Sequence, residues 1–531
     1  MSIAVAEKQK QIALEMKHIT KTFGKVVANK DVDLTVYRGE ILAILGENGC
    51  GKTTLMNMIA GIYYPDAGQI FVDGEEVVIR SPKDAFHYRI GMVHQHFKLV
   101  DVLNATENIV LGVKDEKKTS MAEARKKVEA LTERYGFHLD YKKNIHEMSV
   151  SEKQTVEIIK VLYRSADILI LDEPTAVLTP QETEKLFAVL RRMRDDGKSI
   201  IIITHKLHEV LALTDRVAVL RRGEHIATVN TAETNENELT EMMVGKKIEL
   251  NIERLEPENP VDRLMVKNIT CTDREGVKLL DDISFTARAG EILGIAGIAG
   301  SGQRELLESI AGLQHLDSGK IEYLNPKDGE TVNLRDKTPV QIRDLGVRLS
   351  FVPEDRLGMG LVGNMDIIDN MMLRSYRRGH SMFLDRKKPR DLAEKIIESL
   401  EIVTPGPTTP VRRLSGGNVQ KVLLGREIAS SPTVLMAAYP VRGLDINSSY
   451  AIYRLLNEQK KRGVAVIFVG EDLDVLLALC DRIMVINSGH ITGIVDGKTV
   501  NKQEIGLLMT KSTAPAEEGA DHNHEKEAVI S

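Results

Sequence analysis

Short apolar runs alternate along the chain with longer segments in which apolar residues recur at helical spacing. The runs at Ile41–Leu45, Ile168–Leu171 and Ile200–Ile203 are apolar throughout and are bounded by polar residues or glycines. Uninterrupted apolar runs of this length are typical of strands that are covered on both faces. Strands that alternate with helices predict a mostly parallel α/β sheet, which is the fold class we expect.

The same pattern occurs twice. LEMKHIT at 14–20 is echoed by LMVKNIT at 264–270, and RGEILAILGENGCGKTTLMNMIAG at 38–61 is echoed by AGEILGIAGIAGSGQRELLESIAG at 289–312. Between the two glycine-rich loops the offset is 251 residues. A repeat of half the chain predicts two domains with one fold. The apolar runs of the second half are Ile292–Ala296, Val434–Ala437 and Val464–Val469.

The boundary between the halves is predicted from a segment that lacks periodicity. KKIELNIERLEPENPVD is charged and contains two prolines, so we expect a linker at 246–263 between domains at 14–245 and 264–510. The end of the chain, 511–531, is polar and acidic, and we interpret it as a disordered tail.

Composition narrows the choice of partners. The 71 basic and 77 acidic residues are interspersed, so the sequence lacks the basic stripe that is typical of proteins that bind nucleic acid. The three cysteines are too scattered for a metal or redox pair, which fits a reducing cytosol. Charge interrupts the N-terminal stretch and no apolar run is long enough to span a bilayer, so we expect neither a signal peptide nor a transmembrane helix. Any membrane span would come from another chain.

The first candidate for chemistry is a glycine-rich loop between an apolar strand and a helical pattern. Residues 46–53 read GENGCGKT, the pattern of a phosphate-binding loop in the context that it requires. The glycines allow backbone amides to surround phosphate, Lys52 supplies positive charge, and the Thr53 hydroxyl is suited to magnesium. The candidate nucleotide-binding residues here are Gly46, Glu47, Asn48, Gly49, Cys50, Gly51, Lys52, Thr53 and Thr54.

Two adjacent carboxylates end a later apolar strand. In ILILDEP at 168–174, Asp172 is placed to hold magnesium, and Glu173 is placed to orient or deprotonate an attacking water. An acidic pair that caps a helix would look the same in isolation. His205 after IIIIT, Gln95 in GMVHQHF and Phe23 in KTFGK are each compatible with an ordinary core or surface residue when taken alone.

The order of these parts resembles the ATP-binding-cassette family over 14–245 and again over 264–510. The resemblance implies two tandem cassettes, each a RecA-like, mostly parallel α/β core with an antiparallel β subdomain and a helical signature subdomain. It implies that Phe23 stacks on adenine, that Gln95 senses magnesium and couples to a permease, and that His205 contacts the γ-phosphate. The implied cofactors are ATP and Mg²⁺.

A narrower resemblance concerns the fused pair of cassettes. AVLTP at 176–180 and VPEDR at 352–356 look like the tandem subunits that energise bacterial simple-sugar and nucleoside importers, and HQHF at 94–97 leans towards the nucleoside branch. This implies integral membrane permease subunits and an extracellular solute-binding protein as partners, with the chain at the cytoplasmic face of a bacterial membrane. The cassettes would pair within one chain or between two chains.

The second half keeps the frame of the first but not its chemistry. Gln303 and Arg304 replace the loop lysine and threonine, and a neutral amide forms weaker hydrogen bonds to phosphate than an ammonium. Whether Arg304 compensates is open at this point. The carboxylates, the histidine and the glutamine are replaced by Ala438, Tyr439, Glu471 and Glu354, and CTDRE at 271–275 offers no aromatic residue in place of Phe23.

The signature segments show the opposite asymmetry. RLSGGNVQK at 413–421 matches the family signature, with Ser415, Gly416 and Gly417 at the start of a helix whose amides suit an anion. In the first half, Val150 and Ser151 replace the two glycines. The family pairs the loop of one cassette with the signature of the other. We therefore expect one hydrolytic composite site, and an opposite site that at most holds nucleotide.

Cys50 occupies a spacer position in the loop. An inert filler is one interpretation. The other is that Lys52 and the helix N-terminus lower the thiol pKa, so that alkylation blocks ATP binding.

The expected function is that of the ATP-hydrolysing subunit of a sugar or nucleoside importer. The alternative is a soluble tandem-cassette ATPase that acts on the ribosome, although such proteins usually keep two intact sites. A purely structural or regulatory nucleotide-binding module is disfavoured by the complete set of parts in the first half. A chromosome-structuring ATPase would need coiled-coil or zinc insertions, which the sequence lacks.

Overall fold

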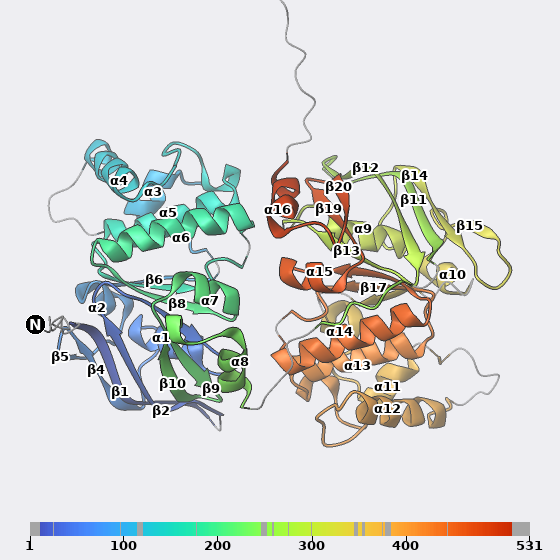
Figure 1. The fold of residues 1–531 in the computed structure, drawn as a ribbon, viewed down its shortest axis with the longest axis horizontal. Helices are drawn as coiled ribbons and strands as arrows, with labels where there is room; N and C mark the ends of the chain where they lie inside the picture. The colour runs from blue at the N-terminus through green and yellow to red at the C-terminus, as the bar shows by residue number, and fades with distance from the viewer. Residues whose placement is uncertain are drawn as a thin grey trace, which may run out of the picture.

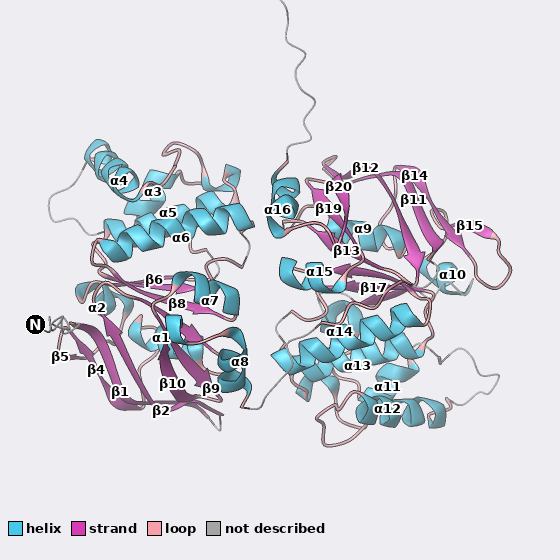
Figure 2. Cartoon of the chain, in the orientation of Figure 1, coloured by secondary structure: helices cyan, strands magenta, loops and turns pink. Residues whose placement is uncertain are grey.

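The chain folds as two halves of the same architecture, placed side by side (Figure 1). The structure is a computed structural model that describes residues 11–24, 26–95, 97–113, 120–176, 178–245, 252–257, 260–273, 275–298, 300–344, 349–352, 356–373, 375–376, 384–442 and 444–511. Within each half, sheets and helices form separate layers (Figure 2).

The core of the first half is a six-stranded sheet with the order β10-β9-β3-β8-β7-β6. Its strands pair in parallel except for β10, which runs antiparallel to β9. Every residue of β3, β7 and β8 is buried, as expected for strands covered on both faces. The strands are β3 (Ile41–Leu45), β6 (Ile90–Val93), β7 (Ile168–Asp172), β8 (Ser199–Thr204), β9 (Arg216–Arg221) and β10 (Glu224–Asn230). The mostly parallel sheet predicted from the sequence is confirmed.

A second, antiparallel sheet has the order β2-β1-β4-β5. Its inner face shares one apolar cluster with the parallel sheet, in which Leu14 and Val32 pack with Ile44 and Ile170. This shared core fixes the β1–β2 hairpin beside the glycine loop. The strands are β1 (Ile12–Phe23), β2 (Val26–Tyr37), β4 (Ala67–Val72) and β5 (Glu75–Val77).

Helices cover the parallel sheet and form a separate helical part. In that part α3, α4 and α5 enclose their own cluster, which includes Ile109, Val128 and Val156. α4 begins at a capping box between Ser120 and Glu123. The helices of this half are α1 (Lys52–Ile59), α2 (Pro82–His87), α3 (Ala105–Val110), α4 (Met121–Tyr135), α5 (Val150–Tyr163), α6 (Pro180–Asp195), α7 (Leu207–Leu213) and α8 (Glu236–Val244).

The second half repeats this topology strand for strand, with sheets β12-β11-β14-β15 and β16-β17-β18-β13-β19-β20. From α5 to α8, each helix and strand has a counterpart that begins 266 residues later. The elements are β11 (Val261–Thr272), β12 (Lys278–Ala289), β13 (Ile292–Ala296), α9 (Gln303–Ile310), β14 (Ser318–Leu324), β15 (Thr331–Asn333), α10 (Pro339–Asp344), β16 (Leu349–Val352), α11 (Ile367–Met372), α12 (Lys387–Ser399), α13 (Gly416–Ala429), β17 (Val434–Ala438), α14 (Ile446–Lys461), β18 (Ala465–Val469), α15 (Leu473–Leu479), β19 (Arg482–Asn487), β20 (His490–Asp496) and α16 (Lys502–Thr510).

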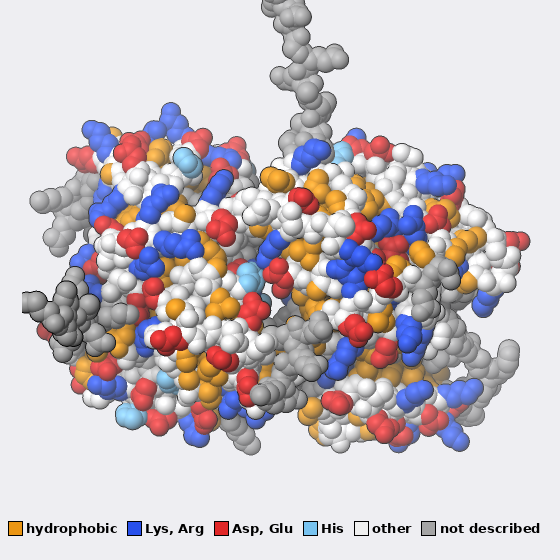
Figure 3. Space-filling model, in the orientation of Figure 1, with side chains coloured by type: hydrophobic (Ala, Val, Ile, Leu, Met, Phe, Trp, Pro, Cys, Tyr) orange, Lys and Arg blue, Asp and Glu red, His pale blue; other side chains and the backbone are white. Residues whose placement is uncertain are grey.

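The two halves lie head to tail. The helical part of the first half is at the top of Figure 1 and that of the second half is at the bottom, with α7 and α15 facing each other between them. α16 packs against α6 of the other half. Basic and acidic side chains are mixed over the face drawn in Figure 3. Among the helices that the structure describes, none is both long enough and apolar enough to cross a membrane.

Part of the expected linker is packed against the second half. Ile252 contacts its core, and the Arg254 guanidinium donates to the carbonyls of Leu477 and Ala478 at the end of α15. Asn457 of α14 donates to the Glu253 carbonyl over 2.7 Å. Residues 252–257, which we call the linker strap, are therefore anchored on α14 and α15. The expected tail lies outside the described residues apart from Lys511.

Candidate active site

The glycine loop of the first half joins the end of β3 to the start of α1. Gly51 precedes α1 with φ of 102°, and a Cβ there would lie 2.3 Å from the Ala28 carbonyl oxygen of the β1–β2 hairpin. Only glycine fits this backbone and this close approach. The Lys52 side chain is buried and donates to the carbonyls of Gly46 and Glu47 over 2.7 and 2.9 Å. The loop thus encloses its own ammonium, whose positive charge suits a phosphate.

Thr53 and Asp172 meet beside this loop. The Thr53 hydroxyl donates to the Asp172 carboxylate, which is buried at the end of β7. Burial, and then the neighbouring charge of Glu173, raises the pKa of Asp172 to about 6. A hydroxyl and a carboxylate are hard oxygen ligands, so this pair fits Mg²⁺ better than a softer metal.

Glu173 is held by two side chains from other elements. Gln95, after β6, donates to one carboxylate oxygen over 2.8 Å, and His205, after β8, contacts the other over 2.9 Å. The hydrogen bond with His205 is the main reason that the pKa of Glu173 is lowered although the group is partly buried. We call Gln95, Glu173 and His205 the Glu173 group. These three sequence-predicted residues come together at the carboxyl ends of adjacent strands.

The backbone at Glu173 is itself unusual. Its φ is 47°, a left-handed value that is costly for a residue other than glycine, and its amide donates to the Ile203 carbonyl. Tyr439 at the equivalent position has φ of 49° and donates to Val469 in the same way. Because both halves share this turn, it belongs to the fold rather than to the carboxylate.

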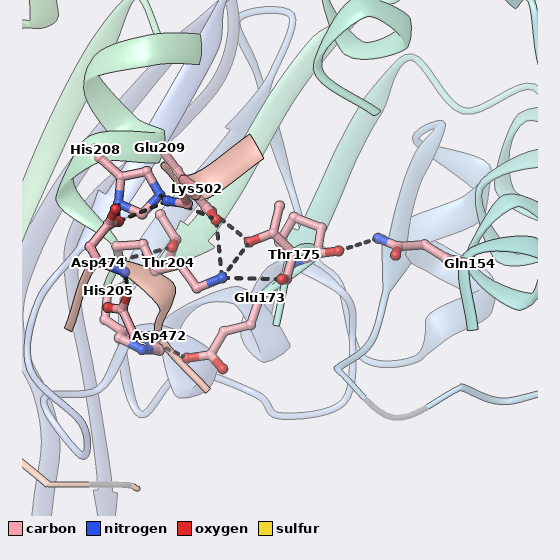
Figure 4. Close-up of polar contacts among 12 residues, drawn as sticks. Gln154, Glu173, Thr175, Thr204, His205, His208, Glu209, Asp472, Asp474 and Lys502 are labelled. Carbon is pink, nitrogen blue, oxygen red and sulfur yellow. Dashed lines mark hydrogen bonds and ion pairs between the residues drawn. The ribbon is translucent and has the colours of Figure 1, made fainter. Parts of the chain in front are cut away.

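A second network supports the Glu173 group from behind (Figure 4). The Thr175 hydroxyl donates to Glu209 of α7 over 2.5 Å, and the Lys206 ammonium lies 3.1 Å from both Glu209 and the Thr175 carbonyl. Gln154 of α5 donates to the Pro174 carbonyl over 2.6 Å. The segment after Glu173 is thereby tied to α7, which directly follows His205. Sequence reasoning did not single out these residues, which are ordinary polar types without a motif.

Phe23 lies apart from the Glu173 group, at the end of β1. Its ring is 43% exposed and meets Tyr63 edge to face at 5.2 Å. The Lys21 ammonium lies 5.6 Å from the Phe23 ring. An exposed aromatic pair of this kind offers a stacking surface for a base. Tyr63 was not predicted, because nothing in its sequence context separates it from a surface tyrosine.

The interpretation of Cys50 as an activated thiol is wrong. Cys50 is 6% exposed, and burial raises the pKa of its thiol even though Lys52 acts in the opposite direction. Lys52 and the helix N-terminus would both lower the thiol pKa, but burial outweighs them because the Cys50 side chain is enclosed by the loop.

We therefore expect Cys50 to react slowly with a small alkylating reagent at pH 7. Its rate in the folded protein should be at least about tenfold below the rate in urea, because the thiol is both protonated and enclosed. Mass spectrometry of Cys50 peptides after timed alkylation measures this. Equal rates in the two states would contradict the burial.

The second half preserves the shape of the loop without its charge. Gly302 precedes α9 with φ of 106°, and the buried Gln303 amide donates to the Ile298 carbonyl over 3.0 Å, as Lys52 does in the first loop. Arg304 lies along its own helix, with Nε 2.7 Å from Glu308. This ion pair joins Arg304 to the next turn of its own helix.

The carboxylate positions of the second half carry other contacts. Ala438 ends β17 and Tyr439 follows it, and burial raises the pKa of Tyr439 to about 12. Glu471, in the place of His205, is paired with Arg442 over 3.2 Å. Glu354, in the place of Gln95, lies outside the described residues.

The two signature helices begin differently. Ser149 and Glu152 form a capping box at the start of α5, and the Glu152 carboxylate also binds Lys143 over 2.9 Å. Ser415 makes no side-chain capping bond to α13, and its hydroxyl accepts from the Asn418 side chain over 2.9 Å. A carboxylate therefore already occupies the anion-attracting end of α5, whereas α13 carries a neutral amide there. The role of Glu152 was not predicted, although the S-x-x-E pattern at 149–152 is typical of a capping box.

A parallel sheet with a glycine loop and a helical part, present twice, together with a carboxylate pair in the first half, defines a tandem ATP-binding cassette protein. The chain belongs to the ABC transporter family, whose model matches residues 29–176 and 280–440. The fold and family expected from the sequence are confirmed, and the protein is an ATPase coupled to transport.

Several curated relatives match nearly the whole chain. The nucleoside import ATP-binding protein NupA of Lactococcus lactis is 41% identical over 94% of this chain and 98% of its own. The guanosine import ATP-binding protein NupO of Bacillus subtilis is 41% identical over 95% of this chain and 98% of its own. The glucose import ATP-binding protein TsgD13 of Haloferax volcanii is 39% identical over 94% and 95%.

Proposed function

We propose that the chain is the ATP-hydrolysing subunit that energises import of a simple sugar or a nucleoside through a membrane permease. The relatives are named for the import of nucleosides, guanosine and glucose, which favours this reading over a ribosome-associated ATPase. The observation that carries hydrolysis is the Glu173 group beside Lys52 and Asp172. Its partners are permease subunits and, through them, an external solute-binding protein, with the chain at the cytoplasmic face of the membrane.

The first cassette supplies the parts that handle the phosphates. Backbone amides from Gly46 to Thr54 and the Lys52 ammonium bind the phosphate oxygens, and Phe23 stacks on the base. Thr53, Asp172 and Gln95 are the residues that would hold Mg²⁺, and the ion would supply positive charge to the phosphate oxygens. The contact between the Thr53 hydroxyl and the Asp172 carboxylate supports this assignment, because it places the two expected metal ligands together.

Glu173 orients the attacking water. Its lowered pKa keeps the carboxylate ionised, so it accepts a hydrogen bond from water without a prior proton loss. Each of its oxygens contacts one side chain, Gln95 or His205, and keeps a lone pair for a further donor such as water. The two side chains are those assigned to the metal and the γ-phosphate, so ATP binding would act on the position of the carboxylate.

The second cassette completes this site through its signature. Ser415, Gly416 and Gly417 open α13, whose N-terminal amides face an anion without a competing carboxylate. The opposite combination joins Gln303 to the α5 terminus that Glu152 already neutralises. One hydrolytic site per chain follows from these two local structures.

Stimulation by a permease distinguishes an importer subunit from a ribosome factor. We expect ATP hydrolysis by the full chain to rise several-fold on reconstitution with its permease in lipid, because the closed pair of cassettes is stabilised by the membrane partner. Ribosomes added at the same concentration are the control. Stimulation by ribosomes and not by the permease would contradict the proposal. Uptake assays with ribose, galactose and purine nucleosides then identify the solute.

A further inference from the structure

Two residues at equivalent positions of the two cassettes touch each other. His208 of α7 and Asp474 of α15 are 266 residues apart, which is the offset between these helices. Nδ1 of His208 lies 3.5 Å from an Asp474 oxygen. In a pair of domains related by a two-fold axis, a residue meets its own counterpart only close to that axis. The His208–Asp474 contact therefore marks the pseudo-two-fold axis of the cassette pair.

The contacts on either side obey the same symmetry. On one side α16 packs against the start of α6, where the Gln181 amide donates to the Gln503 carbonyl over 3.0 Å. On the other side Ile446, at the start of α14, packs against the cluster that includes Leu239 and Met243 of α8. α6 and α14 are counterparts, as are α8 and α16. The two contacts are thus made by equivalent pairs of helices.

The charges at the axis break this symmetry. The Lys502 ammonium lies 2.8 Å from Asp474 and 3.3 Å from Nε2 of His208, whereas the counterpart of Lys502 in the first cassette is Glu236. Figure 4 shows the three side chains converging from α7, α15 and α16. With the proton on Nδ1, the His208 ring turns an N–H toward Asp474 at 3.5 Å and accepts from Lys502 at Nε2. The ring therefore fits between the acidic and the basic group that the second cassette presents.

We propose that His208, Asp474 and Lys502 are a pairing code that joins a first cassette to a second cassette and rejects two cassettes of the same kind. Two second cassettes in this arrangement would bring Asp474 against another Asp474, each already paired with its own Lys502. Two first cassettes would bring His208 against His208, with neither Asp474 nor Lys502 to bind. In either wrong pair the contacts of His208 with Asp474 and Lys502 are lost, and loss of partners is one way in which an interface rejects a wrong pair.

The code has a consequence for hydrolysis, which rests on the proposed function. Only the unlike pair brings the Lys52 loop to the Ser415 signature. The axis is also joined to the active site along the chain, since His208 is followed by Glu209, which binds Thr175 two residues after Glu173. If the two cassettes do not pair at α7, the Ser415 signature does not reach the Glu173 group.

Cross-linking of the full-length chain tests the code independently of activity. Gln181→Cys and Gly506→Cys place one thiol on α6 and one on α16, where a Cβ on Gly506 would lie 2.4–3.0 Å from Gln181 side-chain atoms. The three native cysteines are buried. Mild oxidation is expected to give a disulfide within one chain, which migrates as a monomer. A cross-linked dimer as the main product would overturn pairing within the chain.

Charge exchange at the axis then tests the specificity. In this background Asp474→Lys should lower the cross-link yield at early times about fivefold or more, because it sets a second ammonium beside Lys502 and His208. Adding His208→Asp should restore most of the yield. Asp262→Lys, at a comparably exposed ion pair with Arg288 inside one cassette, is the matched control and should leave the yield unchanged.

The outcomes separate the code from the proposed function. If the double variant cross-links no better than Asp474→Lys alone, the code is wrong. If the cross-link yields follow the code but ATP hydrolysis in the same variants without the cysteines does not change, then the composite active site fails and the code stands. A fall in hydrolysis with unchanged cross-linking would overturn the code, because pairing would then not be what the axis controls.

Discussion

Replacing Glu173 with glutamine is expected to lower steady-state ATP hydrolysis by about 10²- to 10³-fold, with ATP affinity changed little. The amide keeps the size of the side chain and can still contact Gln95 and His205, but it cannot accept a proton from an attacking water. Phosphate release at saturating ATP and Mg²⁺ measures turnover, and equilibrium nucleotide binding measures affinity.

Tyr439→Phe is the matched control, because Tyr439 occupies the same left-handed turn in the second cassette. Its hydrolysis should remain within about twofold of the parent, since nothing at that position is asked to orient water. If Glu173→Gln retained most of the turnover, the asymmetric assignment of one hydrolytic site would be wrong.

The second large effect is expected from Asn418→Glu. This change recreates at 415–418 the capping box that Ser149 and Glu152 form in the first cassette. The new carboxylate would occupy the amides at the start of α13 and repel the γ-phosphate from the composite site. Losing such preorganised donors and adding a like charge should lower turnover by about 10²-fold or more.

Misfolding would not explain a loss of turnover in Asn418→Glu, because a capping box stabilises the helix that it begins. Thermal unfolding of Asn418→Glu should occur at an equal or higher temperature than in the parent while activity falls. Glu152→Asn is the reciprocal variant, and it should leave hydrolysis within about twofold because the loop opposite α5 has no lysine. Unchanged turnover in Asn418→Glu would remove the α13 terminus from the active site.

The sequence predicted those parts of the molecule that depend on local order. Ile41–Leu45 and Ile292–Ala296 are strands with the predicted bounds, because an apolar run between a charged turn and a glycine loop leaves little alternative. The residues of the Glu173 group were found one by one from motif order. Their hydrogen bonds could not be predicted, since these depend on which strands are neighbours in the sheet.

Where prediction failed, the missing quantity was the three-dimensional environment. The Cys50 thiol was assigned a lowered pKa from its neighbours along the chain, but burial decides its direction. The contact between Lys502 and His208 joins residues that are 294 positions apart in the sequence, and the pattern of apolar residues does not predict contacts over such a separation. Glu152 is a different case, because the S-x-x-E pattern at 149–152 predicts its capping box without any knowledge of the fold.

The anchored linker strap sets the local concentration of one cassette around the other. Ile252 is fixed on the second half, and Gly245 ends α8 of the first, so the six residues between these anchor points allow a span of at most about 25 Å. A tether that short corresponds to an effective concentration in the millimolar range. Dilution of the protein therefore cannot separate the two parts of the active site, and turnover per chain should be the same at nanomolar and micromolar protein.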